Sequence, residues 1–254
     1  MKAAVLTTEK ALAIVVRQAD FSESSRVVTF FSKEFGRFSA LAKGAKRLKG
    51  PFDAALDLLS TCEIVFIRKS SGTLSLLTQA KLVRRFSPVS TSLNSLYGGY
   101  YIADLLSCLT EEEDPDSRIF DLAASALSDL SDPNGDSAAV IVGFEVQLLH
   151  LVGSFPNLYD CFACGETVEL VGKFAHWVSQ GGLLCGACRK QDYEHRSISA
   201  GSIAVLRKMT DESSTLSLRL RLTKEQSAEC HQLAVSAITH VLGRKPGTLR
   251  YMKF

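Results

Sequence analysis

The sequence predicts a multidomain α+β protein in which a small all-β domain precedes a mostly helical one. Residues 1–85 contain five short runs rich in Val, Ile, Phe and Thr, separated by turn signals. After residues 87–92 (SPVSTS) the apolar positions follow the spacing of helices. Two CxxC pairs then interrupt the helical pattern. At about 100–200 residues per domain, 254 residues suffice for two domains, which we expect at 1–85 and 86–254.

The runs of the first domain predict five strands, at Leu12–Arg17, Arg26–Phe31, Arg37–Ala42, Cys62–Arg68 and Thr73–Lys81. The second and third strands form a hairpin through Lys33–Gly36, in which Gly36 supplies the positive φ of the turn. Five short strands in so few residues form a small barrel or sandwich, and we expect a five-stranded barrel of the OB type.

Apolar residues at helical spacing predict three helices after residue 92, over 93–108, 119–130 and 140–149. Asp114 and Pro115 give the second of these an N-cap followed by proline at the first helical position. A late helix begins with the capping box Thr223-x-x-Gln226 and ends at Gly243.

Four of the seven cysteines have the spacing C-x2-C-x20-C-x2-C, at Cys161, Cys164, Cys185 and Cys188. Each CxxC turn directs two thiolates at one ion, and two such turns complete the closed tetrahedral coordination of a structural zinc. We therefore expect one structural Zn2+ per chain, in a zinc finger at residues 158–192. His176 lies between the pairs and could replace a cysteine, although a strand residue is the expected role. The other three cysteines read as buried apolar residues.

Charge divides unevenly along the chain. Residues 1–85 hold 15 Lys/Arg and 7 Asp/Glu (+8), whereas residues 86–254 hold 14 and 20 (−6), which sum to the net +2. A basic domain of the OB type indicates nucleic acid, which such domains bind with phosphate-contacting cations and base-stacking aromatics. Phenylalanines at 30, 31, 35, 38 and 52 lie near the cations, with core packing as the expected role of most. The candidate phosphate contacts are Arg26, Arg37, Lys43, Lys46, Arg47, Lys49, Arg68, Lys69, Arg84 and Arg85.

No catalytic motif accompanies these features. The sequence lacks a phosphate-binding P-loop, H-E-x-x-H, G-x-S-x-G and a G-x-G-x-x-G after a strand. The carboxylate run Glu111–Asp114 reads as a solvated loop between helices. We therefore expect a non-enzymatic nucleic-acid-binding protein. A zinc-ribbon nucleic-acid-processing enzyme and an RNA-associated OB protein remain the alternatives.

The sequence predicts neither a secretory signal nor a membrane span. Polar residues from Thr7 onward cut short the apolar run at Ala3–Leu6, and no apolar stretch approaches the roughly 20 residues that cross a bilayer. We expect a soluble cytoplasmic protein that does not bind membranes.

Three segments stand out beside the CxxC pairs: Glu23–Thr29 (ESSRVVT), Gly36–Arg47 (GRFSALAKGAKR) and Gly181–Cys185 (GGLLC). Together, over nearly the whole chain, they resemble the bacterial RecO family, the recombination mediators of the RecF pathway. The resemblance implies an N-terminal OB domain, a helical domain carrying a zinc finger, binding to single- and double-stranded DNA, and strand annealing. It also implies contact with a RecR-like mediator and with single-strand-binding protein during recombinase loading, and a nucleoid-associated location. No motif marks the surfaces for these protein partners.

Overall fold

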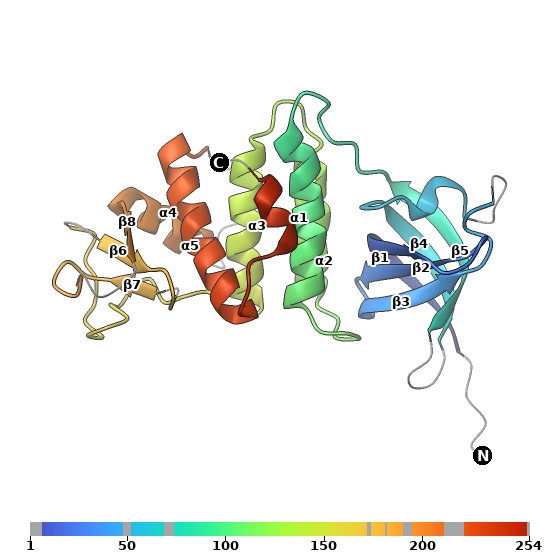
Figure 1. The fold of residues 1–254 in the computed structure, drawn as a ribbon, viewed down its shortest axis with the longest axis horizontal. Coiled ribbons are helices and arrows are strands. Elements are labelled where there is room, and N and C mark those ends of the chain that lie inside the picture. Colours follow the sequence, from blue (N-terminus) through green and yellow to red (C-terminus); the bar gives the residue numbers. More distant parts are fainter. Residues whose placement is uncertain are drawn as a thin grey trace, which may run out of the picture.

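The computed structural model describes residues 7–47, 52–68, 74–171, 174–180, 182–189, 195–210 and 221–252. Three parts lie in a row, with a group of helices between the N-terminal sheet and the cysteine-containing module (Figure 1). This arrangement confirms the predicted α+β chain, in which a five-stranded N-terminal sheet precedes the helices.

The strands of the N-terminal sheet are β1 (Thr7–Asp20), β2 (Arg26–Ser32), β3 (Gly36–Ala42), β4 (Thr61–Arg68) and β5 (Ser75–Arg84). They pair in the order β1-β2-β3-β5-β4, and β4 also pairs with β1, so the ladder closes into a barrel. Only the β3–β5 pair is parallel. Alternate side chains fill the barrel, among them Phe30, Phe38 and Phe66, because successive residues of a strand point to opposite faces. The short helix η1 (Asp53–Leu56) adds Ala55 and Leu56 to this core.

The central helices are α1 (Leu93–Leu109), α2 (Ser117–Asp129) and α3 (Ser137–Leu151). Each begins after a polar N-cap whose side chain accepts a backbone N–H: Ser92, Asp116 and Asp136. The predicted cap of α2, Asp114, is therefore wrong by two residues. The reason is that the preceding loop is held against the barrel, where the Glu113 N–H donates to the Arg37 carbonyl at 2.9 Å, so the helix begins only at Ser117.

Two further helices, α4 (Ala200–Met209) and α5 (Lys224–Leu242), pack beside α3 and are followed by η2 (Gly247–Tyr251). The predicted capping box opens α5, and Gly243, with φ +66°, ends it. The sequence patterns did not predict α4. Nowhere in the described part of the chain does a helix combine the length and apolar character required to cross a membrane.

The barrel docks on the helices through the β2–β3 turn and the loop between α1 and α2. A Cβ atom on Gly36 would lie 2.3 Å from the Asp114 carbonyl oxygen, so the two backbones meet at a glycine. Ion pairs join Arg37 to Glu112 at 3.2 Å and Arg68 to Glu113 at 2.6 Å. The acidic run is the exposed loop between helices that the sequence predicts, and it also contacts the barrel. Lys33 also pairs with Asp121 of α2, at 2.8 Å.

Candidate metal centre and nucleic-acid interface

The cysteine module is built on a small antiparallel sheet of β6 (Phe174–Trp177), β7 (Gly182–Leu184) and β8 (His195–Ile198), in the order β7-β6-β8. One CxxC turn precedes this sheet in sequence, and the other follows β7 directly. Phe174, Leu183, Leu184 and Ile198 are buried in the same core as the helices. The module is therefore packed onto the helical layer by apolar side chains.

The structure brings the four predicted ligands together. The Sγ atoms of Cys161, Cys164, Cys185 and Cys188 all lie within 4.8 Å of one another. Four thiolates at about 2.3 Å from a tetrahedral zinc would be about 3.8 Å apart, and the Sγ atoms of Cys164 and Cys185 are 3.9 Å apart. That separation is far beyond the ~2.05 Å of a disulfide bond. The donor set therefore fits a structural zinc.

Backbone hydrogen bonds shape the first cysteine turn. Gly165, at φ +74°, donates its N–H to the Cys161 carbonyl at 2.8 Å, and Cys161 donates to the Glu166 carbonyl at 2.8 Å. The Cys185 N–H donates to the Cys161 Sγ at 3.3 Å. Burial raises the pKa of the Cys161 thiol, but this bond and those from the N–H groups of Cys164 and Ala163 outweigh it and lower the pKa to about 6. These N–H groups thus favour the thiolate of Cys161, which is the form that binds zinc, whereas the neighbouring cysteines raise the pKa of Cys188.

His176 is not part of this cluster. It lies in β6 with 1% of its surface exposed, and its Nε2 is 3.4 Å from the Ser236 Oγ of α5. The strand role expected for this residue is therefore confirmed.

Four of the ten predicted DNA contacts meet beside the β1–β2 loop (residues 21–25). The Lys46 N–H donates to the Ser24 carbonyl at 3.2 Å, which holds the turn after β3 against this loop. Arg26 and Lys46 both pair with Asp20, at 3.2 and 3.0 Å, and their hydrogen bonds lower the pKa of that carboxyl. Lys43 and Arg47 are exposed and have no ion pair within the described residues. We call Arg26, Lys43, Lys46 and Arg47 the loop cluster.

Two other predicted contacts point toward the helical domain. The Arg37 side chain is 19% exposed, and its guanidinium reaches the Thr110 carbonyl at 3.1 Å as well as Glu112. Arg68 lies over the Phe35 ring, 5.6 Å from its centroid, while pairing with Glu113. Both cations are therefore engaged in joining the two domains.

The remaining four predicted contacts lie elsewhere. Arg84 and Arg85 are exposed at the end of β5 and the start of the segment leading to α1, and Arg85 is 3.4 Å from Asp57. Lys49 and Lys69 fall outside the described residues.

The exposed phenylalanine of the barrel is one that the sequence analysis did not select. Phe30, Phe31, Phe38 and Phe52 are buried, and Phe35 is partly buried beneath Arg68. Phe21, in the β1–β2 loop beside the loop cluster, is 61% exposed. The sequence did contain a signal for Phe21, because a large aromatic residue in a turn segment lies outside the strand positions that fill the core of the barrel.

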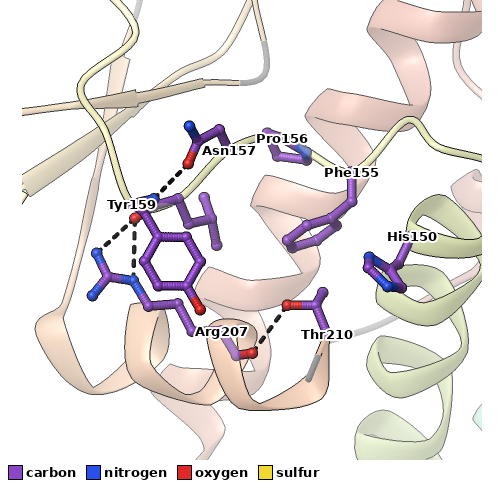
Figure 2. Close-up of a pocket in the computed structure, with 8 residues that line it drawn as sticks. His150, Phe155, Pro156, Asn157, Tyr159, Arg207 and Thr210 are labelled. Atoms are coloured by element: carbon purple, nitrogen blue, oxygen red, sulfur yellow. Dashed lines mark hydrogen bonds between the residues drawn. The ribbon is translucent and has the colours of Figure 1, made fainter. Parts of the chain in front are cut away.

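A separate cavity of about 550 Å³ lies between the segment after α3 and the end of α4 (Figure 2). Arg207 donates to the Leu158 carbonyl at 2.7 and 3.2 Å and to the Val168 carbonyl at 3.0 Å, and lies 4.5 Å from the centroid of the Tyr159 ring. The guanidinium thus ties α4 to the first cysteine turn. Among the described residues that line the cavity, no nucleophile is paired with a base.

Two family models match long segments of the chain. The family model for the recombination protein O N terminal matches residues 6–86, and that for the recombination protein O C terminal matches residues 90–250. The chain is 42% identical over 202 residues to the DNA repair protein RecO of Rhodopirellula baltica, covering 79% of this chain and 74% of that protein. It is 28% identical over 246 residues to the DNA repair protein RecO of Desulfatibacillum aliphaticivorans, covering 95% of each.

Proposed function

The chain belongs to the recombination protein O family of DNA repair proteins, and from this premise we propose that it is a non-enzymatic recombination mediator. In this role it binds single- and double-stranded DNA, anneals complementary strands and helps load a recombinase onto DNA coated by single-strand-binding protein. The observation that carries the proposal is the loop cluster, whose four cations lie beside the exposed Phe21 on one part of the barrel.

We assign the barrel to the OB type, whose binding surfaces are the face of strands 2 and 3 and the loops between strands 1 and 2 and between strands 4 and 5. Arg26 is the first residue of β2, directly after the β1–β2 loop, and the Lys46 N–H bond to the Ser24 carbonyl holds the turn that carries Lys43, Lys46 and Arg47 against that loop. The closed order β1-β2-β3-β5-β4 supports the assignment.

In the proposed complex, Lys43 and Arg47 contact phosphates, and a base stacks on Phe21. Asp20 holds Arg26 and Lys46 through the two ion pairs, which positions both cations beside the same loop. Phosphate contacts orient the strand without reading its sequence, and stacking accepts every base because each has a π-face. Such a surface suits a mediator that must act on any sequence.

We further propose that Cys161, Cys164, Cys185 and Cys188 hold one structural zinc. Four thiolates leave no coordination position for water or substrate, so the ion would serve to connect the two CxxC turns. A RecR-like mediator and single-strand-binding protein are the proposed protein partners, and retention of either on the immobilised protein tests that part of the proposal.

Salt dependence tests the DNA surface. For single strands, log K falls with log salt by about 0.7 per phosphate contact, so four contacts give a slope of about −3. The double variant Lys43→Ala/Arg47→Ala should flatten this slope by about 1.4 and weaken binding equally for all base sequences. The measurement is fluorescence anisotropy of labelled single strands at several salt concentrations.

The matched control is Lys10→Ala/Lys81→Ala, which removes two exposed cations from β1 and β5 of the same barrel. It has the same net charge as the Lys43→Ala/Arg47→Ala variant. Its slope should stay close to that of the wild type. If the loop-cluster variant is folded and keeps the wild-type slope and affinity, the proposed surface is wrong. Magnesium-dependent cleavage of DNA by the purified protein would overturn the non-enzymatic assignment.

A further inference from the structure

A second group of aromatic and cationic side chains lies on the helical domain, where η2 rests against α1 (Figure 1). The rings of Tyr97 and Tyr251 are stacked, with centroids 5.2 Å apart and planes 15° apart. Tyr100 meets Tyr97 edge-on at 6.5 Å, and the Arg250 guanidinium lies 4.7 Å from the centroid of the Tyr251 ring. We call these four residues the C-terminal aromatic patch.

The patch is partly open to solvent. Tyr100 is 36% exposed and Tyr251 is 44% exposed, and the Arg250 residue is also exposed. By contrast, the next residue of α1, Tyr101, is fully buried, with its hydroxyl donating to Glu145 at 2.7 Å. One face of α1 therefore belongs to the core, while the face carrying Tyr100 is available to a ligand.

A specific contact holds the patch together. The backbone N–H and the hydroxyl of Thr248 both donate to the Asp104 carboxylate of α1, at 3.0 and 2.8 Å. These two hydrogen bonds fix the start of η2 against α1, so that the Tyr251 ring reaches the Tyr97 ring. Asp104 is the one acidic residue of α1, and its carboxylate accepts both of these hydrogen bonds.

The C-terminal segment is basic within an acidic domain. Residues 230–254 contain four cations, Arg244, Lys245, Arg250 and Lys253, and no acidic residue, a balance of +4. Residues 86–229 contain 10 Lys/Arg and 20 Asp/Glu, a balance of −10. Aromatic rings among cations are what single-stranded nucleic acids bind, because bases stack on rings and on guanidinium planes while phosphates pair with the charges.

We propose that the C-terminal aromatic patch is a second surface for single-stranded nucleic acid, separate from the loop cluster of the barrel. The inference rests on the proposed function, because a protein that anneals strands gains from holding two of them at once. Arg84 and Arg85 precede the segment that runs from the barrel to the start of α1 (Figure 1).

Two single variants test the patch, Tyr100→Ala and Arg250→Glu, neither of which removes the Tyr97–Tyr251 stack. Loss of one stacked base costs about 1 kcal/mol or more, which corresponds to about fivefold. We expect each variant to slow the annealing of two complementary labelled oligonucleotides by about fivefold or more. A single strand carrying 5-iododeoxyuridine should photocrosslink to the peptides containing Tyr100 and Tyr251 in the wild type, and more weakly in Arg250→Glu.

The matched control is Tyr159→Ala. Tyr159 is also an exposed tyrosine, at 55%, beneath an arginine, with Arg207 4.5 Å from its ring centroid. Its neighbourhood in sequence carries Asp160, Glu166 and Glu169 instead of cations. This variant should anneal strands at the wild-type rate, and all three variants should keep the wild-type thermal unfolding midpoint.

The outcomes separate this inference from the proposed function. If both patch variants are folded and anneal normally, while the Lys43→Ala/Arg47→Ala variant loses strand binding, the patch proposal is overturned and the proposed function stands. If the wild type neither binds nor anneals single strands, both are overturned. If the patch variants lose only the capture of a protein partner, the patch is a protein interface and the nucleic-acid proposal is wrong.

Discussion

At the scale of single residues, Glu229 shows how one carboxylate joins two helices. Its Oε2 accepts the backbone N–H of Ser199 at 3.0 Å and the hydroxyls of Ser199 and Ser202 at 2.7 and 2.6 Å. Burial raises the pKa of Glu229, but the hydrogen bonds from Ser202 and Ser199 outweigh it, so the pKa lies below its ordinary value. The ionised side chain of α5 thereby stabilises the first turn of α4.

Glu229→Gln should therefore lower the free energy of unfolding at pH 7 by about 1 kcal/mol, the usual contribution of such hydrogen bonds. A lowered folded-state pKa stabilises the protein above the unfolded-state pKa of about 4.3, and this contribution disappears as pH falls through the folded-state pKa. The difference between wild type and variant in urea unfolding should thus shrink below pH 4. A difference that is constant from pH 7 to pH 3.5 would contradict this role.

Substitution of Phe21 tests whether bases stack on the barrel surface. Phe21→Ala should weaken single-strand binding by about 1–3 kcal/mol while leaving the salt slope unchanged, because the ring contributes stacking and no charge. Val83→Ala, which truncates another exposed apolar side chain of the barrel (53% exposed), serves as the control. Anisotropy titrations at several salt concentrations distinguish the two effects, and an altered slope in Phe21→Ala would show that the ring acts by some other means.

At the scale of elements, the β2–β3 turn and the α1–α2 loop are shaped for each other. Gly36 has φ +64°, and its missing side chain admits the Asp114 backbone. Around it, Arg37 and Arg68 reach Glu112 and Glu113. Exposed ion pairs contribute little, at about 0–1 kcal/mol each. We therefore attribute the docking chiefly to this close backbone contact and to the buried Ile14, Phe31 and Leu59, which join the helical core.

Gly36→Ala and Gly153→Ala form a matched pair of substitutions. Both glycines have positive φ, but a Cβ on Gly153 would meet nothing within 4 Å. Gly153→Ala should therefore lower the free energy of unfolding only by about 1–2 kcal/mol, the cost of a left-handed backbone for a residue with a Cβ. Gly36→Ala adds a clash with Asp114 and should be the less stable of the two. It should also make residues 85–92, between the domains, more sensitive to limited proteolysis. Equal stability and equal cleavage in the two variants would contradict the docking role of the turn.

At the scale of the whole molecule, the buried apolar residues of the described part of the chain form two separate hydrophobic cores. One fills the barrel, and the other runs from the barrel–helix contact through the helices to the cysteine module, including Leu183 and Ile198. The cysteine cluster adjoins only the second core, where Cys161 itself is buried. Disturbance of the metal centre should therefore spread through the helical domain and spare the barrel.

Cys161→Ser should remove about one zinc per chain and increase amide hydrogen exchange in residues 158–189, with little change in residues 7–47. Single-strand binding by the barrel should persist in part. Cys108→Ser, which alters a cysteine outside the cluster, should retain the metal. Elemental analysis together with hydrogen exchange measures both effects. A freshly purified, unchelated protein without zinc would overturn the metal assignment.

The sequence by itself determined the features encoded within a few neighbouring residues. Runs rich in Val, Ile, Phe and Thr located the five strands of the first domain, helical spacing located α1, α2, α3 and α5, and the spacing of the four cysteines predicted their cluster. The basic balance of residues 1–85 was also readable, because it needs no contact information.

Only the tertiary structure decided what each charged or aromatic residue does. Arg37 and Glu112 are 75 residues apart, and Arg68 and Glu113 are 45 apart, so no local pattern shows that these cations join the two domains. Likewise, alternation does not tell which phenylalanines are buried once a sheet closes, and the exposed ring proved to be Phe21. Local periodicity is set by the geometry of the backbone, whereas the partner of a side chain depends on which distant segments the fold brings beside it.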